Sequence, residues 1–146
     1  MSVKENKELI RRCFKDWNAL NGDAAKLRSF FDMYYPPAYV YHSARQDMNR
    51  EQAIEYFIPL ISQAPDANFA IDDQVAEGDE VVTRYTMQYT HNRTVEGIPA
   101  TGKRISAKGI VIDRIVRGKS QESWEFYDEL GVLTQLGAIP SGAPNK

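Results

Sequence analysis

The sequence contains little of what disulfide and metal sites require. Its 146 residues include one cysteine, Cys13, and two histidines, His42 and His91. A single cysteine cannot form an internal disulfide, which agrees with a reducing compartment. A zinc site built from histidine and cysteine would need all three of these residues together with a carboxylate. We therefore expect neither a metal ion nor another cofactor.

Long apolar runs and an excess of positive charge are also absent. No stretch approaches the roughly 18 consecutive apolar residues of a transmembrane helix. The 18 basic and 20 acidic residues leave a net charge of −2, whereas a nucleic-acid-binding protein usually carries a positive excess. Residues 1–8 are charged and lack the apolar core of a secretion signal. We therefore expect a cytoplasmic protein that binds neither nucleic acid nor membrane.

The residues that are present suit one globular domain. Apolar side chains make up 42% of the chain, and its length is close to the roughly 150 residues typical of a domain. The last residues are rich in proline, glycine and small side chains. We expect a single domain over residues 1–137 and a disordered tail over 138–146.

Hydrophobic spacing predicts three helices in the first half of the chain, over residues 4–20, 24–33 and 50–63. In the first, apolar residues recur with the 3.6-residue period of a helix. They are Leu9, Ile10, Cys13, Phe14 and Trp17. The third is preceded by Asn49, and Gln52 three positions later completes a capping box. A short strand is expected at 39–41.

After residue 66 the period changes from 3.6 to 2, which is typical of β-strands. We expect four long strands near 67–77, 80–93, 103–116 and 119–128. Tight hairpin turns are expected at 77–79 and 117–119, and a longer loop at 97–102. Helices followed by a meander of antiparallel strands indicate an α+β fold. A sheet that curls around three helices would leave a conical cavity.

Several segments carry a family resemblance. They are the loop Gly97–Lys103, the pair Gly109-Ile110, the hairpin segment Arg114–Lys119 and the stretch from Trp124 to Gly137, which contains Trp124-Glu125, Asp128, Leu130-Gly131 and Gln135-Leu136-Gly137. Over residues 5–137 the chain resembles the SnoaL-like polyketide cyclases, which belong to the superfamily named after nuclear transport factor 2.

The resemblance implies a cystatin-like α+β cone. Three N-terminal helices would pack on a curled, antiparallel, four-stranded sheet around a pocket for a small hydrophobic molecule, and the protein would be a homodimer. The best-understood family members close polyketide rings by intramolecular aldol condensation without a metal. That reaction needs a base for a proton next to carbonyl groups and a donor for the developing oxyanion.

Glu125 is the leading catalytic candidate. Trp124 and Phe126 share the opposite face of its strand, so alternation alone favours a solvent-facing Glu125. The resemblance favours the pocket instead, because family cyclases carry their acid/base aspartate at this position. An apolar pocket would raise the pKa of the carboxyl group. Glutamate is one methylene longer than aspartate, which changes where the carboxyl group lies.

His91 is the second catalytic candidate, because it follows Thr90 as in many relatives. Arg84 and His91 lie on opposite faces of the same predicted strand. Their side chains therefore cannot both line the pocket unless a bulge intervenes. Val111 and Ser123 match positions at which relatives carry histidine. The residues expected to line the pocket are Tyr41, His42, Arg84, Val111, Ser123 and Tyr127.

Three functions fit these residues. The first is acid/base chemistry of the cyclase or isomerase type. The second is hydrolysis such as water addition to an epoxide, which would need Glu125, Asp113 or another acid, and Arg84 around one water. The third is non-enzymatic ligand binding or a dimeric interaction module. Val111 and Ser123 favour the third, since neither supplies the expected imidazole.

Overall fold

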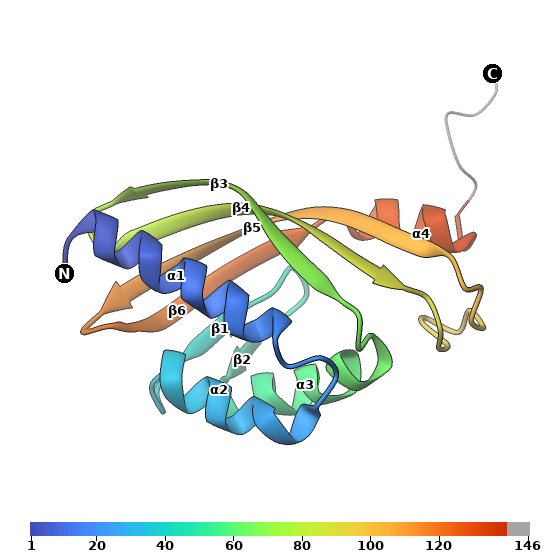
Figure 1. Ribbon diagram of the computed structural model, residues 1–146, viewed down its shortest axis with the longest axis horizontal. Coiled ribbons are helices and arrows are strands. Elements are labelled where there is room, and N and C mark those ends of the chain that lie inside the picture. Colours follow the sequence, from blue (N-terminus) through green and yellow to red (C-terminus); the bar gives the residue numbers. More distant parts are fainter. Residues whose placement is uncertain (140–146) are drawn as a thin grey trace.

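The computed structural model describes residues 1–139 (Figure 1). The helices are α1 (Val3–Asn18), η1 (Ala24–Lys26, a 3₁₀ turn), α2 (Leu27–Tyr34), α3 (Arg50–Gln63) and α4 (Glu129–Leu136). The strands are β1 (Val40–His42), β2 (Asp47–Asn49), β3 (Asn68–Glu77), β4 (Glu80–Thr90), β5 (Arg104–Val116) and β6 (Lys119–Tyr127). From residue 140 onward, the predicted tail lies outside the described residues.

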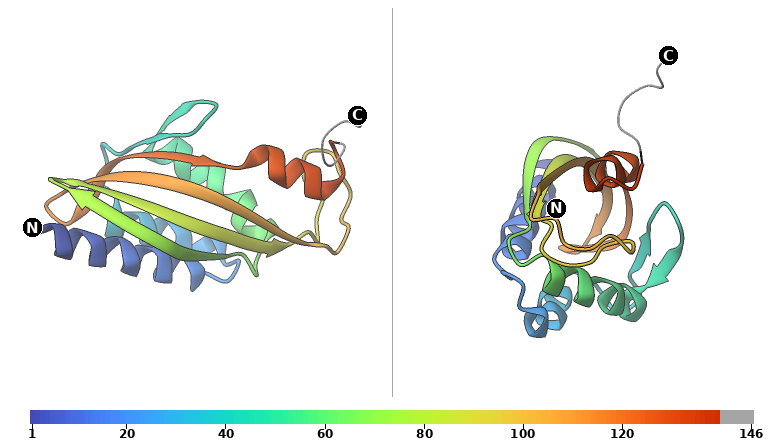
Figure 2. Two further views of the ribbon diagram at one scale, coloured as in Figure 1. Left: turned by 90° about the horizontal axis from the view of Figure 1, so that it is seen from above. Right: turned by 90° about the vertical axis from the view of Figure 1, so that its right-hand side faces the viewer.

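The structure confirms the α+β class, but its sheet differs from the predicted four-stranded antiparallel one. The four long strands form as predicted, but the described residues build a six-stranded mixed sheet in the order β2-β1-β6-β5-β4-β3. β1 pairs parallel to β6, and β2 pairs antiparallel to β1. The sheet is strongly curled (Figure 2) but is not a closed barrel, because β2 and β3 are its two edges. The segment after Pro36-Pro37 therefore extends the sheet by a hairpin.

The three N-terminal helices form, and a fourth was not predicted. Ser2 caps α1, and the predicted capping box of Asn49 and Gln52 begins α3. Asp128 accepts a hydrogen bond from the Gly131 amide and caps α4. Gly137 ends α4 in the left-handed conformation, with φ 87°.

Glycine residues allow the tight turn between β5 and β6. At the β5–β6 hairpin, Arg117 and Gly118 both have positive φ, 52° and 76°. Two consecutive positive φ values are typical of a type I′ turn, whose twist matches that of the flanking strands. A register shift between Arg114 and Ile115 follows the hairpin, and it brings Val111 opposite Glu125.

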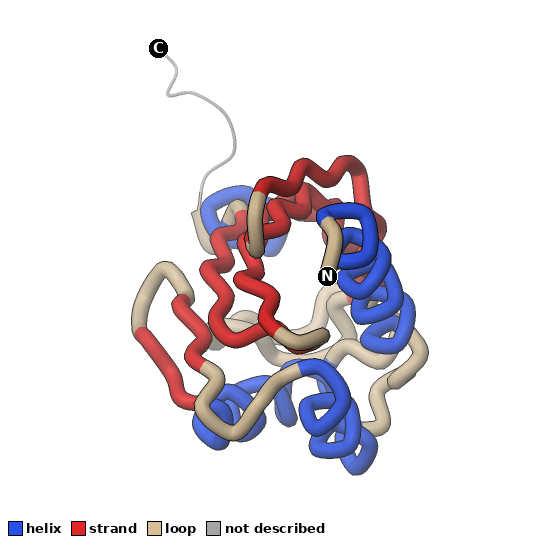
Figure 3. The backbone as a smooth tube through the Cα atoms, turned by 90° about the vertical axis from the view of Figure 1, so that its left-hand side faces the viewer, coloured by secondary structure: helices blue, strands red, loops and turns tan. Residues whose placement is uncertain are grey.

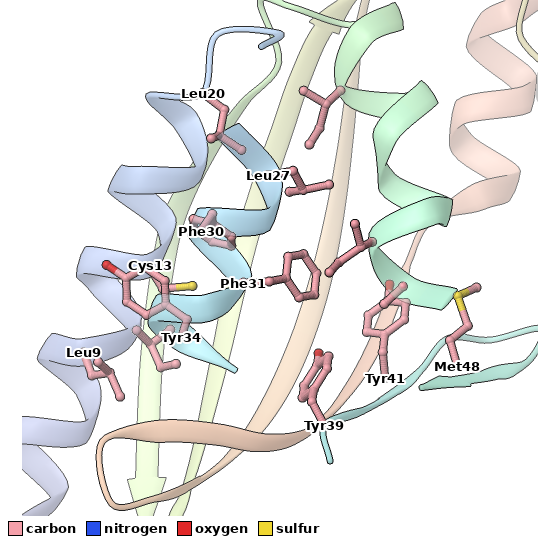
Figure 4. Close-up of a cluster of buried hydrophobic side chains, with 14 of the residues drawn as sticks. Leu9, Cys13, Leu20, Leu27, Phe30, Phe31, Tyr34, Tyr39, Tyr41 and Met48 are labelled. Atoms are coloured by element: carbon pink, nitrogen blue, oxygen red, sulfur yellow. The ribbon is translucent and has the colours of Figure 1, made fainter. Parts of the chain in front are cut away.

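The helices and the concave face of the sheet enclose the main core (Figure 3). Side chains from α1, α2, α3 and β1 meet there (Figure 4), and Leu27 and Ile54 are fully buried. A smaller cluster joins α4 to β5 through Val132, Leu136 and Ile105. α4 therefore covers one end of the concave face. None of the helices within residues 1–139 has the length and apolar character needed to cross a membrane.

Candidate active site

A cavity of about 410 Å³ lies on the concave side of the sheet. Aromatic side chains from the helices and from four strands supply much of its wall. They include Trp17, Tyr41, Tyr56, Phe57, Phe69, Tyr85, Tyr89 and Tyr127. Met48, Met87, Val132 and Leu133 add aliphatic surface. This volume and lining are typical of sites for small, largely apolar molecules.

Glu125 lies in this wall between two tyrosines. Tyr41 donates a hydrogen bond to its Oε1 over 2.9 Å, and Tyr85 donates to its Oε2 over 2.5 Å. Tyr41 comes from β1 and Tyr85 from β4, so three strands meet at one carboxyl group. Tyr41 and Tyr85 are 7% and 1% exposed, which keeps bulk water away from both hydroxyl groups.

Burial controls the protonation of this group. Removal from water raises the pKa of Glu125 above its ordinary value, while the hydrogen bonds from Tyr85 and Tyr41 oppose the rise. Burial also raises the pKa of both tyrosines, and the nearby Glu125 charge adds to the effect. Both phenols therefore stay protonated and act as donors. The arrangement pairs a proton acceptor with two donors in an apolar cavity.

The structure buries a second acidic group, Asp113, whose charge interacts with that of Glu125. Asp113 on β5 is 4% exposed, and its Oδ1 accepts hydrogen bonds from Ser120 (2.8 Å) and Ser123 (2.6 Å). Burial, together with the Glu125 charge, raises the pKa of Asp113 to about 6, and the two serine hydrogen bonds oppose the rise. Asp113 is not among the residues that line the cavity.

The structure separates His91 from Glu125. His91 lies six positions beyond Tyr85, which is about 20 Å along a strand. It is 1% exposed, and its Nδ1 accepts a hydrogen bond from the Thr101 amide over 3.3 Å. The His91 carbonyl oxygen accepts from the Thr101 and Gly102 amides. His91 thus lines the same cavity as Glu125, as expected, but lies further along β4, where it holds the 92–103 loop.

His42 and Arg84 correct two further expectations, because both lie on the convex face of the sheet. Arg84 has a side chain that is 51% exposed and lies 3.9 Å from Asp72. The His42 ring stacks on Trp124 with centroids 5.2 Å apart. No bulge turns Arg84 inward, since its register with β5 is regular. Neither residue lines the cavity.

Tyr41 and Tyr127 line the cavity, as expected, whereas Val111 and Ser123 contribute no lining. Val111 is buried beside Glu125 on the concave face, and Ser123 is directed to Asp113. Arg84 and Asp113 are therefore kept apart from the cavity, and the arrangement expected for epoxide hydrolysis is not formed.

Sequence reasoning missed Tyr85 as a site residue. Alternation along β4 places Tyr85 on the same face as His91, and this was the available signal. Alternation alone could not show that the Tyr85 hydroxyl reaches across β5 to Glu125. Among residues 1–139, no cluster of three or more histidine, cysteine or acidic side chains could hold a metal ion.

Comparison with known proteins identifies the family. The profile described as SnoaL-like polyketide cyclase matches residues 11–136. The chain belongs to this family. It is 26% identical over 133 residues to the aklanonic acid methyl ester cyclase of Streptomyces peucetius, covering 89% of both chains.

Solved structures share the fold of this SnoaL-like protein. A protein of Acidithiobacillus ferrooxidans assigned as a polyketide cyclase has a TM-score of 0.78 and 26% identity, with 94% of this chain and 99% of that one covered. AclR of Streptomyces galilaeus, assigned as a hydroxylase, has a TM-score of 0.85 and 24% identity, with 98% and 87% covered. The family supports a cyclase or isomerase type of function, but relatives assigned to different reactions share its fold.

Proposed function

We propose that this protein is an acid/base catalyst of the cyclase type, which binds a small, largely apolar carbonyl compound in its cavity. One observation carries the proposal: Glu125 lies in the cavity wall with one tyrosine hydroxyl on each carboxylate oxygen. A carboxylate whose pKa is raised by burial is a stronger base than an exposed one. Glu125 would be the base, and Tyr41 or Tyr85 the hydrogen-bond donor.

The proposed reaction is an intramolecular aldol addition. Glu125 accepts a proton from a carbon next to carbonyl groups, and the C–H electrons move to the carbonyl oxygen. As the negative charge leaves Glu125, a tyrosine hydroxyl can donate to the new enolate oxygen instead. The enolate carbon then bonds to a second carbonyl carbon of the same molecule, and that oxygen takes the proton from Glu125. Nothing is oxidised or reduced.

The cavity and the relatives support this class of ligand. Its volume of about 410 Å³ suits a molecule of a few fused rings, and its aromatic wall favours flat, apolar surfaces. The relative in Streptomyces peucetius is named for the cyclisation of aklanonic acid methyl ester. We therefore choose this compound and a panel of aromatic β-keto esters as test substrates.

The test compares wild type with Glu125→Gln, which keeps the shape of the side chain and removes the base. We expect the wild type to convert a test compound into a cyclised isomer of unchanged mass, followed by chromatography and mass spectrometry. The variant should lose at least about 100-fold in kcat. Ligand binding, followed by tyrosine and tryptophan fluorescence, should persist.

Glu80→Gln is the matched control. Glu80 is exposed at the start of β4, the strand that also carries Tyr85. This control should leave turnover unchanged. Equal rates in wild type and Glu125→Gln would remove Glu125 from the mechanism. Tight binding of a test compound with no turnover in the wild type would favour the non-enzymatic binding function instead.

A further inference from the structure

Gly109 is the one position on the concave face of β5 that has no side chain. The other concave residues of this strand are Ile105, Ala107, Val111, Asp113 and Ile115. Glycine weakens a strand interior and often marks a bulge or a close approach of another group. There is no bulge here, because the register of β5 runs without a shift through Gly109 on both sides. Its φ also lies outside the left-handed region, so the backbone conformation does not require glycine.

The Tyr85 ring occupies the space that a Gly109 side chain would need. A Cβ atom added to Gly109 would lie 2.4 Å from the Tyr85 Oη, 2.5 Å from its Cζ and 2.9 Å from its Cε1. All three distances are shorter than a van der Waals contact between such atoms. The phenol group therefore lies directly on the β5 backbone at Gly109.

The position of Tyr85 relative to Glu125 explains this contact. Tyr85 is on β4 and Glu125 is on β6, with β5 between them. Neighbouring strands are about 4.8 Å apart, so the Tyr85 and Glu125 side chains together must bridge about 10 Å. A tyrosine on β4 can bring its hydroxyl to Glu125 only by lying across β5. Any Cβ atom at the crossing point would lift the ring away from the carboxylate.

We propose that Gly109 is a positioning residue, whose missing side chain leaves the path along which Tyr85 crosses β5 to donate its hydroxyl to Glu125. Gly109 touches no substrate and acts through Tyr85. The consequence for catalysis rests on the proposed function of Glu125, whereas the positioning itself does not. It can therefore be tested without a substrate.

The experiment is a titration of Glu125 by NMR in protein labelled with ¹³C at the glutamate carboxyl carbon. Glu125→Gln identifies the signal by its loss. The hydrogen bond from Tyr85 lowers the pKa of Glu125, so losing this bond should raise it by about 1 pH unit. We expect this rise in Gly109→Ala and an equal one in Tyr85→Phe. The double variant should titrate like Tyr85→Phe alone, since the hydroxyl can be lost only once.

Gly131→Ala is the matched control. A Cβ atom there would lie 2.3 Å from the Asp128 Oδ2, a comparable clash at the start of α4 rather than beside Glu125. This control should leave the Glu125 titration unchanged. An unchanged Glu125 titration in folded Gly109→Ala would overturn the proposal, whatever the activity of Glu125→Gln proves to be.

Gly109→Ala can also fail by unfolding, and a second variant covers that case. Tyr85→Leu combined with Gly109→Ala removes the ring atoms that the new methyl group would meet. If the single variant unfolds and this double variant folds, the steric dependence on Tyr85 is supported. If both unfold, β5 requires glycine at position 109 whether or not Tyr85 is present, and the proposal is wrong.

Discussion

Glu125 is stabilised by hydroxyl groups and not by a cation. Among the ion pairs within residues 1–139, none includes Glu125. A nearby cation would lower the pKa of the carboxyl group and weaken it as a base. Tyrosine donors hold the carboxylate in place while leaving its pKa above the ordinary value. In the proposed reaction, the same donors would serve the substrate oxygen after the proton transfer.

The buried Asp113 carboxyl group lowers the free energy of unfolding at neutral pH. Its pKa is about 6 in the folded protein, against 3.8 for the ordinary group. The free energy of unfolding should therefore be highest below pH 3.8 with respect to this group, and should fall as the pH rises through 6. The full difference is about 3 kcal/mol. We expect Asp113→Asn to remove this slope, as measured by urea unfolding between pH 4 and pH 8.

Subtracting the Asp113→Asn stability curve from the wild-type curve isolates this effect from other titrating groups. Ser120→Ala is the accompanying control, because it removes one of the hydrogen bonds that lower the pKa of Asp113. It should move the fall in stability to higher pH. A flat difference curve across this range would show that the Asp113 carboxyl titrates normally in the folded protein.

At the scale of secondary structure, most of the fold follows from periodicity. The bounds of α3 match the prediction, and the four long strands lie within three residues of theirs. Alternation indicated the wrong concave face for β6, because Trp124 and Phe126 are more apolar than Glu125 and Tyr127 on the other face. The structure leaves Phe126 54% exposed on the convex face. The family resemblance, rather than alternation, placed Glu125 correctly.

The elements that were missed are short and depend on tertiary contacts. β2 has three residues and exists through its pairing with β1. α4 has eight residues with a glycine in its first turn, although Asp128 before it and Gly137 after it are ordinary capping signals. The misplacement of His42 has the same origin. Its place on the convex face follows from the parallel pairing of β1 with β6, which no local pattern predicts.

His42 connects the hairpin that carries Tyr41 to the centre of the sheet. Its Nδ1 lies 2.6 Å from Asp47 on β2, and its Nε2 lies 2.6 Å from Glu122 on β6. Arg114 also contacts Glu122, and Trp124 stacks on the ring. Both nitrogens can donate to these carboxylates only when the ring is protonated. Burial lowers the pKa of His42, but the hydrogen bonds to Asp47 and Glu122 outweigh it, and the pKa is raised.

The hairpin should therefore be held more firmly at acidic than at alkaline pH. A raised histidine pKa stabilises the folded protein below the ordinary value of about 6.5, and this stabilisation is lost as the pH rises through the folded-state value. We expect the loss of stability in His42→Asn to be greater at pH 6 than at pH 9, as measured by urea unfolding. Asp47→Asn, which keeps the ring and one carboxylate, should show a smaller pH dependence. Equal losses at both pH values would contradict this role.

At the scale of the whole molecule, the convex face of the sheet carries an exposed apolar surface. Val75, Val82, Ile112 and Trp124 form a row across four strands in register. Ile110 and Phe126, which are 44% and 54% exposed, lie side by side in the next row. We call these six residues the convex patch. A contiguous apolar patch on a sheet face is typical of an interaction surface.

We propose that a second copy of the chain covers the convex patch, as the family resemblance implies. Such a dimer would leave both cavities free, because Glu125 and the convex patch lie on opposite faces of the sheet.

Phe126→Glu would place a charge without a partner in the centre of the interface. We expect it to weaken association by at least about 100-fold. Analytical ultracentrifugation should find the wild type at twice its chain mass of 16.6 kDa and the variant at the chain mass. Lys4→Glu, a charge reversal at an exposed position of α1, is the control and should remain dimeric. A wild type that sediments as a monomer at 100 µM, about 1.7 mg/ml from that mass, would refute the dimer, whereas a Phe126→Glu variant that stays dimeric would place the interface elsewhere.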